Sequence, residues 1–158
     1  MVVNQVDPAA LEVLQLAFFA GVAANQQVRA ALEAKGFAGL REAHGYIVQH
    51  LLASPRSVGE LARLLGISQQ AVSKSIAELA RNRYVEDAPS PDARVRKLRL
   101  SRRGKAAVQA ARELRRAQEQ ALIAHTGEEQ YRQARQVLLA ALEALGALDA
   151  VRERKLRP

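Results

Sequence analysis

The sequence contains no cysteine and no tryptophan, and only three phenylalanines and three tyrosines occur among its 158 residues. Without cysteine the chain can form no disulfide, no thiolate zinc site and no thiol-based redox switch. The few aromatic residues, set against many alanines and leucines, favour helices that pack through small and straight-chain side chains. The length suits one domain, or a small domain with an oligomerisation arm.

Long apolar segments are also absent. No apolar run approaches the roughly 18 residues that a membrane-spanning helix needs. The N-terminus lacks the basic start and following apolar stretch that are typical of a secretory signal. We therefore expect a soluble, cytoplasmic protein with no membrane partner.

The local motifs of common enzyme classes are missing as well. The chain has no phosphate-binding glycine loop, no Gly-x-Ser-x-Gly segment and no His-Glu-x-x-His pair. Its histidines are His44, His50 and His125, and the six-residue spacing of the first two places them on different sides of a helix. No acidic partners that would complete a metal site with them can be identified. The sequence therefore predicts no enzyme activity, no cofactor and no metal, and the histidines are expected to be structural or pocket-lining.

The most informative stretch is 57–83, which predicts two short helices joined by a tight turn. Ser57 and Glu60 have the spacing of a capping box, in which each side chain bonds a free backbone N–H at a helix start. Apolar residues then recur on one helical face, at Val58, Leu61, Ala62 and Leu65. Gly66 is expected to end this helix because glycine tolerates positive φ.

The second of these helices is expected to start at Ser68, whose hydroxyl can cap it. Its apolar stripe is Val72, Ile76 and Leu79, so the outward side carries Gln69, Gln70, Ser73, Lys74 and Ala77. Glutamine can pair with adenine in the major groove, lysine and serine can bond base edges or phosphates, and alanine leaves room for a thymine methyl. Helix-turn-helix pairs also occur in proteins that never touch DNA, so this pair alone does not decide the function.

The segment after Arg83 predicts a two-stranded hairpin. A short strand-like piece, YVED, is followed by the loop APSPDAR and by VRKLRLS, in which Leu98 and Leu100 alternate with Lys97 and Arg99. This alternation indicates a strand with one buried face and one solvated, basic face. A helix-turn-helix followed directly by such a hairpin is a winged helix, in which the wing supplies a second contact to the duplex.

The formal net charge of +8 is concentrated in the same region. Residues 54–105 carry a net charge of +7, whereas residues 1–53 carry −1 and residues 106–158 carry +2. A run of charge is more often a solvated face than a binding site. A basic excess confined to a segment with DNA-reading geometry is, however, what the neutralisation of phosphates requires.

These segments resemble the MarR family of bacterial transcription regulators. The matching pieces are AVSKSIAEL at 71–79, the strand YVE, the wing tip Asp92-Ala93-Arg94, and LRLSRRG at 98–104. Length and helix order match too, so the resemblance covers nearly the whole chain. Two departures are modest: Ser101 stands where the family usually has Thr, and Asn82-Arg83-Tyr84 stands where a glycine and an apolar residue often precede the strand.

The resemblance implies that Arg94 enters the minor groove and that Asp92 orients it. We expect the major groove to be read from the second helix and the backbone to be held by the wing, so the predicted DNA contacts are Ser68, Gln69, Gln70, Ser73, Lys74, Asp92, Arg94, Arg96, Lys97 and Arg99. Many members of the family leave DNA when a small aromatic or phenolic effector binds between the dimerisation helices and the winged helix. Phe18, Phe37, His44 and Tyr46 could line such a cleft, and the alternative, that these residues are simply core, stays open.

Helical patterns flank the winged helix on both sides. Asp7-Pro8 predicts the start of a long helix that ends near Lys35, and a second helix is expected at 40–53 with Ala43, Ile47 and Leu51 in register. After the wing, Ser101 should cap a helix that reaches about His125. Thr126 and Glu129 predict a second capping box, which would start a leucine-rich final helix.

The expected fold is mainly α with a small β-hairpin wing. It divides into an N-terminal dimerisation helix at 1–36, a winged helix-turn-helix domain at 37–104 and C-terminal dimerisation helices at 105–158. An amphipathic face this rich in leucine would remain wet in a monomer, so the first helix and the last two are expected to form a homodimer interface.

The functional expectation is a ligand-responsive repressor that binds double-stranded DNA as a homodimer. Two recognition helices would enter successive major grooves, about 10 base pairs apart, on a pseudo-palindromic operator. The runner-up is a sequence-neutral architectural protein that binds DNA or RNA through the same basic face. A third reading is a helical interaction module whose basic patch meets an acidic protein.

Overall fold

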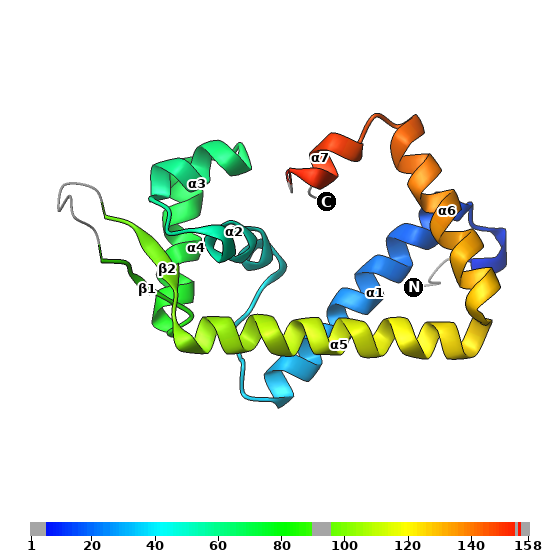
Figure 1. Ribbon diagram of the computed structural model, residues 1–158, viewed down its shortest axis with the longest axis horizontal. Helices are drawn as coiled ribbons and strands as arrows, with labels where there is room; N and C mark the ends of the chain where they lie inside the picture. Colours follow the sequence, from blue (N-terminus) through cyan, green and yellow to red (C-terminus); the bar gives the residue numbers. More distant parts are fainter. Residues whose placement is uncertain (1–5, 90–95, 154, 156–158) are drawn as a thin grey trace, which may run out of the picture.

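A long helix, α5 (Arg102–Thr126), runs along the molecule and joins its two ends (Figure 1). The computed structural model describes residues 6–89, 96–153 and 155. One end of α5 carries the helix-turn-helix and the hairpin, and the other end carries α6 (Glu128–Ala144) and the first half of α1 (Val13–Ala34). Packing of α5 against both α1 and α6 joins these terminal helices into one arm.

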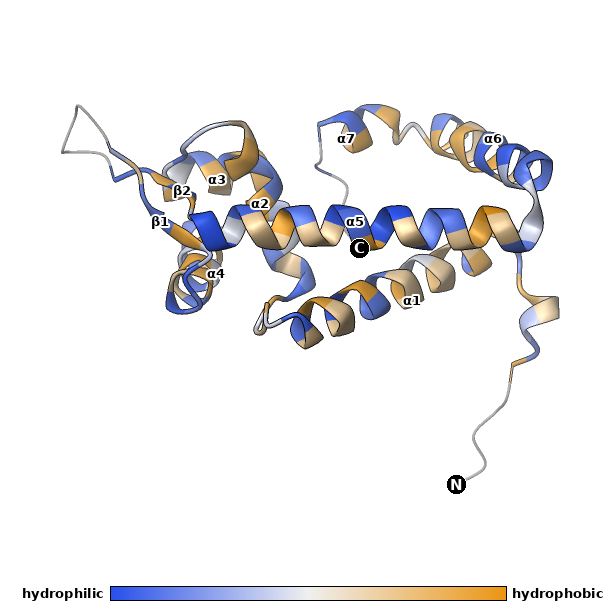
Figure 2. Ribbon diagram, turned by 60° about the horizontal axis from the view of Figure 1, so that its bottom comes forward, coloured by the Kyte–Doolittle hydropathy of each residue, from blue (hydrophilic) through white to orange (hydrophobic). Residues whose placement is uncertain are grey.

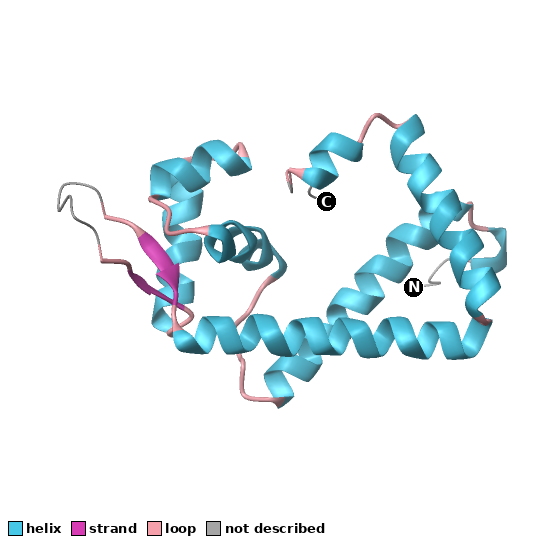
Figure 3. Ribbon diagram, viewed as in Figure 1, coloured by secondary structure: helices cyan, strands magenta, loops and turns pink. Residues whose placement is uncertain are grey.

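The remaining elements are short. They are α2 (Glu42–Ala53), α3 (Val58–Leu65), α4 (Gln69–Arg81), β1 (Val85–Asp87), β2 (Leu98–Leu100) and α7 (Leu148–Arg152). The two strands pair in antiparallel fashion, and Figure 3 shows them as the strand-forming part of an otherwise helical chain. No helix within the described ranges is long and apolar enough to cross a membrane. The mainly α fold with a β-hairpin wing is thus confirmed.

The predicted helix-turn-helix is present with the predicted caps. The backbone N–H of Ser57 donates to Glu60 Oε2 at 2.7 Å, and the backbone N–H of Glu60 donates to Ser57 Oγ at 3.2 Å. The hydrogen bond from the Ser57 backbone is the main reason that the pKa of Glu60 lies below its usual range. Gly66 ends α3 in the left-handed region with φ of 62°, where a side chain would be strained.

A single core holds this region together. It combines the buried faces of α2, α3 and α4 with the inner side of the hairpin, and its members include Ile47, Leu51, Leu61, Leu65, Val72, Ile76, Leu79, Tyr84, Leu98 and Leu100. The apolar stripes predicted for α3 and α4 are therefore confirmed. Because a buried aliphatic side chain contributes about 1.5–3 kcal/mol, these stripes set how the helices pack.

The hairpin has the alternation that the sequence predicts. Leu98 and Leu100 are buried and Arg99 between them is exposed, in register with Asp87, Val85 and Glu86 of β1. The backbone of Leu98 also exchanges two hydrogen bonds with that of Arg56, at 2.8 and 3.0 Å. The wing is thereby tied to the segment that enters α3.

The prediction of one unbroken N-terminal helix from Asp7 is wrong. Asp7 Oδ1 accepts the backbone N–H of Ala9 at 2.9 Å and starts only a short 3₁₀ helix, Pro8–Ala10. The chain is then extended at Leu11 and Glu12, and the Gln15 side chain accepts the backbone N–H of Glu12 at 3.3 Å. A second set of cap interactions therefore places the start of α1 at Val13.

The corner between α5 and α6 also differs from the prediction. Thr126 does not cap α6, because it is the last residue of α5 and its hydroxyl donates to the Leu122 carbonyl at 2.9 Å. Gly127 makes the turn, and Glu129 pairs with Arg132 of its own helix. The short helix α7, which follows α6, was not predicted.

The start of α5 lies close under the wing base. Ser101 Oγ accepts the backbone N–H of Gly104 at 3.0 Å and donates to the Arg83 carbonyl at 2.6 Å. A Cβ placed on Gly104 would lie 2.1 Å from the Tyr84 carbonyl oxygen, which is part of the backbone and cannot swing away. Only glycine fits this contact between α5 and the chain entering β1.

We expect Gly104→Ala to lower the free energy of unfolding by about 1–3 kcal/mol, since the backbone must shift to admit the methyl group. Gly45→Ala in α2 is the matched control, because a Cβ there meets nothing within 4 Å. That control should be more stable than the wild type by up to about 1 kcal/mol through helix propensity. Urea unfolding at one fixed protein concentration compares the three proteins, and equal stability of both variants would contradict the close contact.

Candidate nucleic-acid interface and adjoining cavity

The outer face of α4 is exposed and polar. It carries the predicted major-groove residues Gln69, Gln70, Ser73 and Lys74, together with Ala77, and all five are exposed. Val72, Ile76 and Leu79 on the opposite face are buried. Packing therefore leaves α4 one orientation, in which its polar side chains face solvent.

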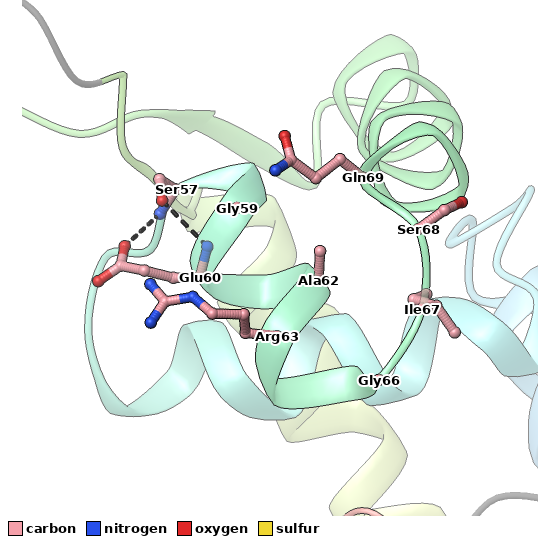
Figure 4. Close-up of a pocket in the computed structure, with 9 residues that line it drawn as sticks. All are labelled: Ser57, Gly59, Glu60, Ala62, Arg63, Gly66, Ile67, Ser68 and Gln69. Atoms are coloured by element: carbon pink, nitrogen blue, oxygen red, sulfur yellow. Dashed lines mark hydrogen bonds between the residues drawn. The ribbon is translucent and has the colours of Figure 1, made fainter.

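A hollow lies between α3 and the start of α4 (Figure 4). Ser68 Oγ accepts the backbone N–H of Ala71 at 3.2 Å, so this predicted contact residue also caps α4. Gln69 points across the hollow toward Gly59 at the start of α3. Arg63, which the sequence reading did not single out, lines the hollow as an exposed cation. The sequence feature that could have indicated Arg63 is its position on the polar side of α3.

The wing arginines are engaged in ion pairs across the hairpin. Arg96 Nε lies 2.6 Å from Asp87 Oδ1, and Arg99 Nε lies 2.9 Å from Glu86 Oε1. All four side chains are exposed, and such surface pairs are worth about 0–1 kcal/mol, so phosphates can replace the carboxylates at little cost. Lys97 is half-buried between them.

The predicted minor-groove residues, Asp92 and Arg94, lie outside the described residues. Their roles stay predictions, as do the DNA contacts assigned to α4 and to the rest of the wing. The structure does establish that α4 and the base of the wing belong to one packed unit through the shared core.

A cavity of about 350 Å³ lies between α1, α2 and α5, next to the winged helix. Its apolar lining includes Val28, Leu32, Leu40, Val48, Ala107, Val108 and Ala111. Its charged lining consists of Arg29, Arg41, Arg112, Arg115 and Glu42, none of which the sequence reading had placed in a cleft. Small-molecule sites commonly combine an apolar lining with a few polar groups in this way.

Two of the four residues predicted to line a ligand cleft are found there. His44 and Tyr46 line the cavity, whereas Phe18 and Phe37 do not. Phe18 lies in the first half of α1, where it is 57% exposed and contacts Phe19 edge-on. Phe37 packs on the winged-helix core, with the Arg103 guanidinium 5.5 Å from its ring centre.

His44 is the buried polar centre of the region. The sequence placed Ala43 in the buried stripe of α2, but Ala43 is exposed and His44 is 1% exposed. His44 Nδ1 accepts the backbone N–H of Arg41 at 3.2 Å, so the neutral ring carries its proton on Nε2. Nε2 then donates to Glu78 Oε2 at 3.0 Å.

Glu78 connects this network to α4. Its carboxylate also pairs with the Arg41 guanidinium, so the start of α2 is held to the inner side of α4 by a charged pair and a neutral imidazole. These residues are more than 30 positions apart in the chain, and no local pattern marks the contact.

Burial lowers the pKa of His44 below its ordinary value, and the nearby charge of Arg41 lowers it further. The folded protein therefore binds fewer protons at this site than the unfolded chain. The stability contributed by the neutral ring is present above pH 6.5, the ordinary value, and is lost as the pH falls through the folded pKa.

We expect the free energy of unfolding of the wild type to fall as the pH is lowered from about 7.5 to about 5. In His44→Gln, which keeps an N–H donor for Glu78 but does not titrate, the fall should be shallower. His125→Gln is the control, since His125 is exposed at the far end of α5 and should keep the wild-type slope. Denaturant unfolding at several pH values measures this, and equal slopes for His44→Gln and wild type would refute the assignment.

Comparison with known proteins adds to this geometry. Residues 38–94 match the family model described as the MarR family. A search of curated proteins finds no significant match. Among solved structures, MepR of Staphylococcus aureus, described as a transcription regulator of a multidrug efflux pump, is 20% identical with a TM-score of 0.68. That match covers 85% of this chain and 99% of MepR.

Two further solved structures share the fold. A MepR–DNA complex from S. aureus is 21% identical with a TM-score of 0.64, covering 80% of this chain and 96% of that one. YusO of Bacillus subtilis is 19% identical with a TM-score of 0.67, covering 83% and 93%. The family match spans α2, α3, α4 and β1, so this part of the chain is similar to the MarR family, and the solved structures show that the winged-helix fold is shared.

Proposed function

We propose that this protein is a DNA-binding transcription regulator that recognises a specific operator as a homodimer and responds to a small effector. The observation that carries the proposal is the outer face of α4, which is polar and exposed because the opposite face is buried in the core. Gln69, Gln70, Ser73 and Lys74 would contact base edges, and Arg94, oriented by Asp92, would enter the minor groove. Arg96, Lys97 and Arg99 would bind mainly phosphates.

The homodimer is supported by the apolar surface at the far end of α5. Large apolar side chains of α1, α5 and α6 are 37–58% exposed there, namely Val13, Leu14, Leu16, Phe18, Phe19, Val22, Leu122, Val137, Leu138 and Leu139. Figure 2 shows apolar residues along α1 and α6. A monomer rarely leaves so many of these side chains wet, whereas a two-fold partner would cover them.

Such a dimer would present two copies of α4 to one face of the duplex. Successive major grooves are about 10 base pairs apart, so the proposed operator is pseudo-palindromic. An effector would act by binding more tightly to a dimer whose recognition helices are wrongly spaced. The cavity between α1, α2 and α5 supports this, because it lies between the arm and the winged helix. An aromatic or phenolic compound would suit its apolar walls.

We expect a discrete, competitor-resistant band when the full-length protein is shifted on its own promoter fragment, and weaker binding at higher salt. Arg94→Ala should weaken binding by about 1–3 kcal/mol, and Lys74→Ala should also change the site preference. Gln130→Ala, an exposed substitution on α6, is the control and should bind as the wild type does. Binding that excess unrelated DNA abolishes would favour the architectural alternative. If the wild-type protein binds no DNA even at low salt, the alternative of an acidic protein partner would be favoured.

We expect the wild type to sediment as a dimer and the double variant Phe19→Asp/Leu138→Asp to sediment as a monomer. Two buried carboxylates at the proposed interface would carry a large desolvation penalty, and operator affinity should fall with dimer loss. Ala43→Asp, an exposed change in α2 away from the apolar surface, is the matched control and should remain a dimer. Analytical ultracentrifugation decides this, and a monomeric wild type would rule out the proposed homodimer.

A further inference from the structure

Two carboxylates share the exposed face of the hairpin with the arginines that the proposed function assigns to phosphates. Glu86 lies opposite Arg99 in the register of the two strands, and Asp87 lies beside Arg96. We propose that Glu86 and Asp87 restrain DNA binding by the wing, because they occupy its arginines and repel the phosphates that would replace them. This inference rests on the proposed function, since it requires that the wing contact DNA.

Both arginines are bound through their guanidinium groups. Arg96 Nε lies 2.6 Å from Asp87 Oδ1, and Arg99 places Nε and Nη2 each 2.9 Å from Glu86 Oε1. The four side chains are 45–72% exposed, so a DNA backbone could reach them without any rearrangement of the core. Each arginine then has to exchange a carboxylate for a phosphate when the wing binds.

The two carboxylates cancel most of the positive charge of the hairpin. Residues 85–89 and 96–100 contain three cations and two carboxylates, which leaves a net charge of +1. Affinity for a nucleic-acid backbone, and its dependence on salt, grow with the number of phosphates that cations neutralise. A hairpin that neutralises its own arginines therefore contributes less to DNA binding than the number of its cations suggests.

The third cation of the hairpin, Lys97, also lies near a carboxylate. The pKa of Glu60 lies below its usual range mainly because of the hydrogen bond from the Ser57 backbone, and the charge of Lys97 lowers it further. Glu60 cannot serve as a test, because it belongs to the cap of α3. Glu86 and Asp87 can, since backbone hydrogen bonds pair their strand with β2.

A phosphate that takes an arginine does not remove the carboxylate from the surface. The carboxylate and the phosphate would lie on two sides of one guanidinium group, well inside the Debye length of about 8 Å at physiological ionic strength. Two negative charges at that separation repel each other, and salt screens only part of the repulsion. The restraint therefore has two parts, the loss of the ion pair and the repulsion that follows.

A purely structural role makes the opposite prediction. Cross-strand pairs of opposite charge stabilise sheets, so these pairs could simply brace the wing. If bracing were their main effect, loss of the carboxylates would loosen the hairpin and weaken DNA binding. Restraint predicts that the same change strengthens binding, so the sign of the effect distinguishes the two roles.

The test variant is Glu86→Gln/Asp87→Asn, which removes both charges and keeps the side-chain shapes. Fluorescence anisotropy follows binding of the full-length protein to the labelled promoter fragment and to an unrelated duplex of the same length, at several salt concentrations. The variant should bind both DNAs at least about threefold more tightly at low salt, as expected for the loss of two exposed ion pairs. The slope of log affinity against log salt should steepen by up to about one per carboxylate.

Glu129→Gln/Asp149→Asn is the matched control. It changes the net charge by the same amount and also removes one glutamate and one aspartate, which pair with the exposed Arg132 and Arg152 of their own helices. These pairs lie on α6 and α7, away from the wing (Figure 1). The control should keep the wild-type affinity and salt slope. If it gains as much as the wing variant, the effect belongs to net charge and the inference is overturned.

An Arg96→Gln background shows whether the restraint acts through the arginine. Asp87→Asn should raise DNA affinity less in this background than in the wild type, because the guanidinium that it would free is already gone. A double-mutant cycle of these two changes measures that difference. An equal gain in both backgrounds would contradict the inference.

The outcomes separate this inference from the proposed function. If the wild type binds no DNA even at low salt, the proposed function fails and the restraint fails with it. If the wild type binds DNA but Glu86→Gln/Asp87→Asn binds equally well or more weakly, only the inference is overturned. A gain confined to the promoter fragment would also overturn it, because both DNAs present the same phosphates.

Discussion

The burial of Val72, Ile76 and Leu79 holds α4 on the winged helix, and the rest of the structure depends on that packing. With this face committed to the core, the polar residues of α4 can only face outward. The same core includes Leu98 and Leu100 from the wing, so α4 and the hairpin form one unit. The basic surface acquires a defined shape because apolar contacts fix the elements that carry it.

The start of α5 joins that unit to the long arm. Arg103 lies over the rings of Phe37 and Tyr84, at 5.5 and 5.0 Å from their centres, and donates to the Gly36 carbonyl at 2.6 Å. The Tyr84 hydroxyl donates to the Ala38 carbonyl at 2.8 Å. These contacts clamp the end of α1, the wing base and α5 together. In the proposed homodimer, a rigid connection of this kind would allow the arrangement of the arm to set the spacing of the two copies of α4.

The sequence by itself determined the parts whose interactions are local. The capping box of Ser57 and Glu60, the turn at Gly66 and the two apolar stripes all rest on contacts within a few residues, so periodicity and spacing predicted them correctly. The alternation in β2 is local for the same reason. Local patterns gave wrong helix starts at two places. At the N-terminus, Asp7 and Glu12 each start a helix, so the long helix begins later than predicted. At the end of α5, the Thr126 hydroxyl donates to a carbonyl of its own helix and does not cap the next one.

Only the tertiary structure decided which side chains share the cavity and how it meets α4. His44, and not Ala43, lies on the buried face of α2, where its ring donates a hydrogen bond to Glu78, 34 residues away in the chain. Phe18 lies exposed in the first half of α1 and Phe37 packs on the winged-helix core. Arginines at the start of α2 and on α1 and α5 line the cavity. Burial and charge pairing across distant segments depend on how helices pack, and a linear pattern carries no record of that geometry.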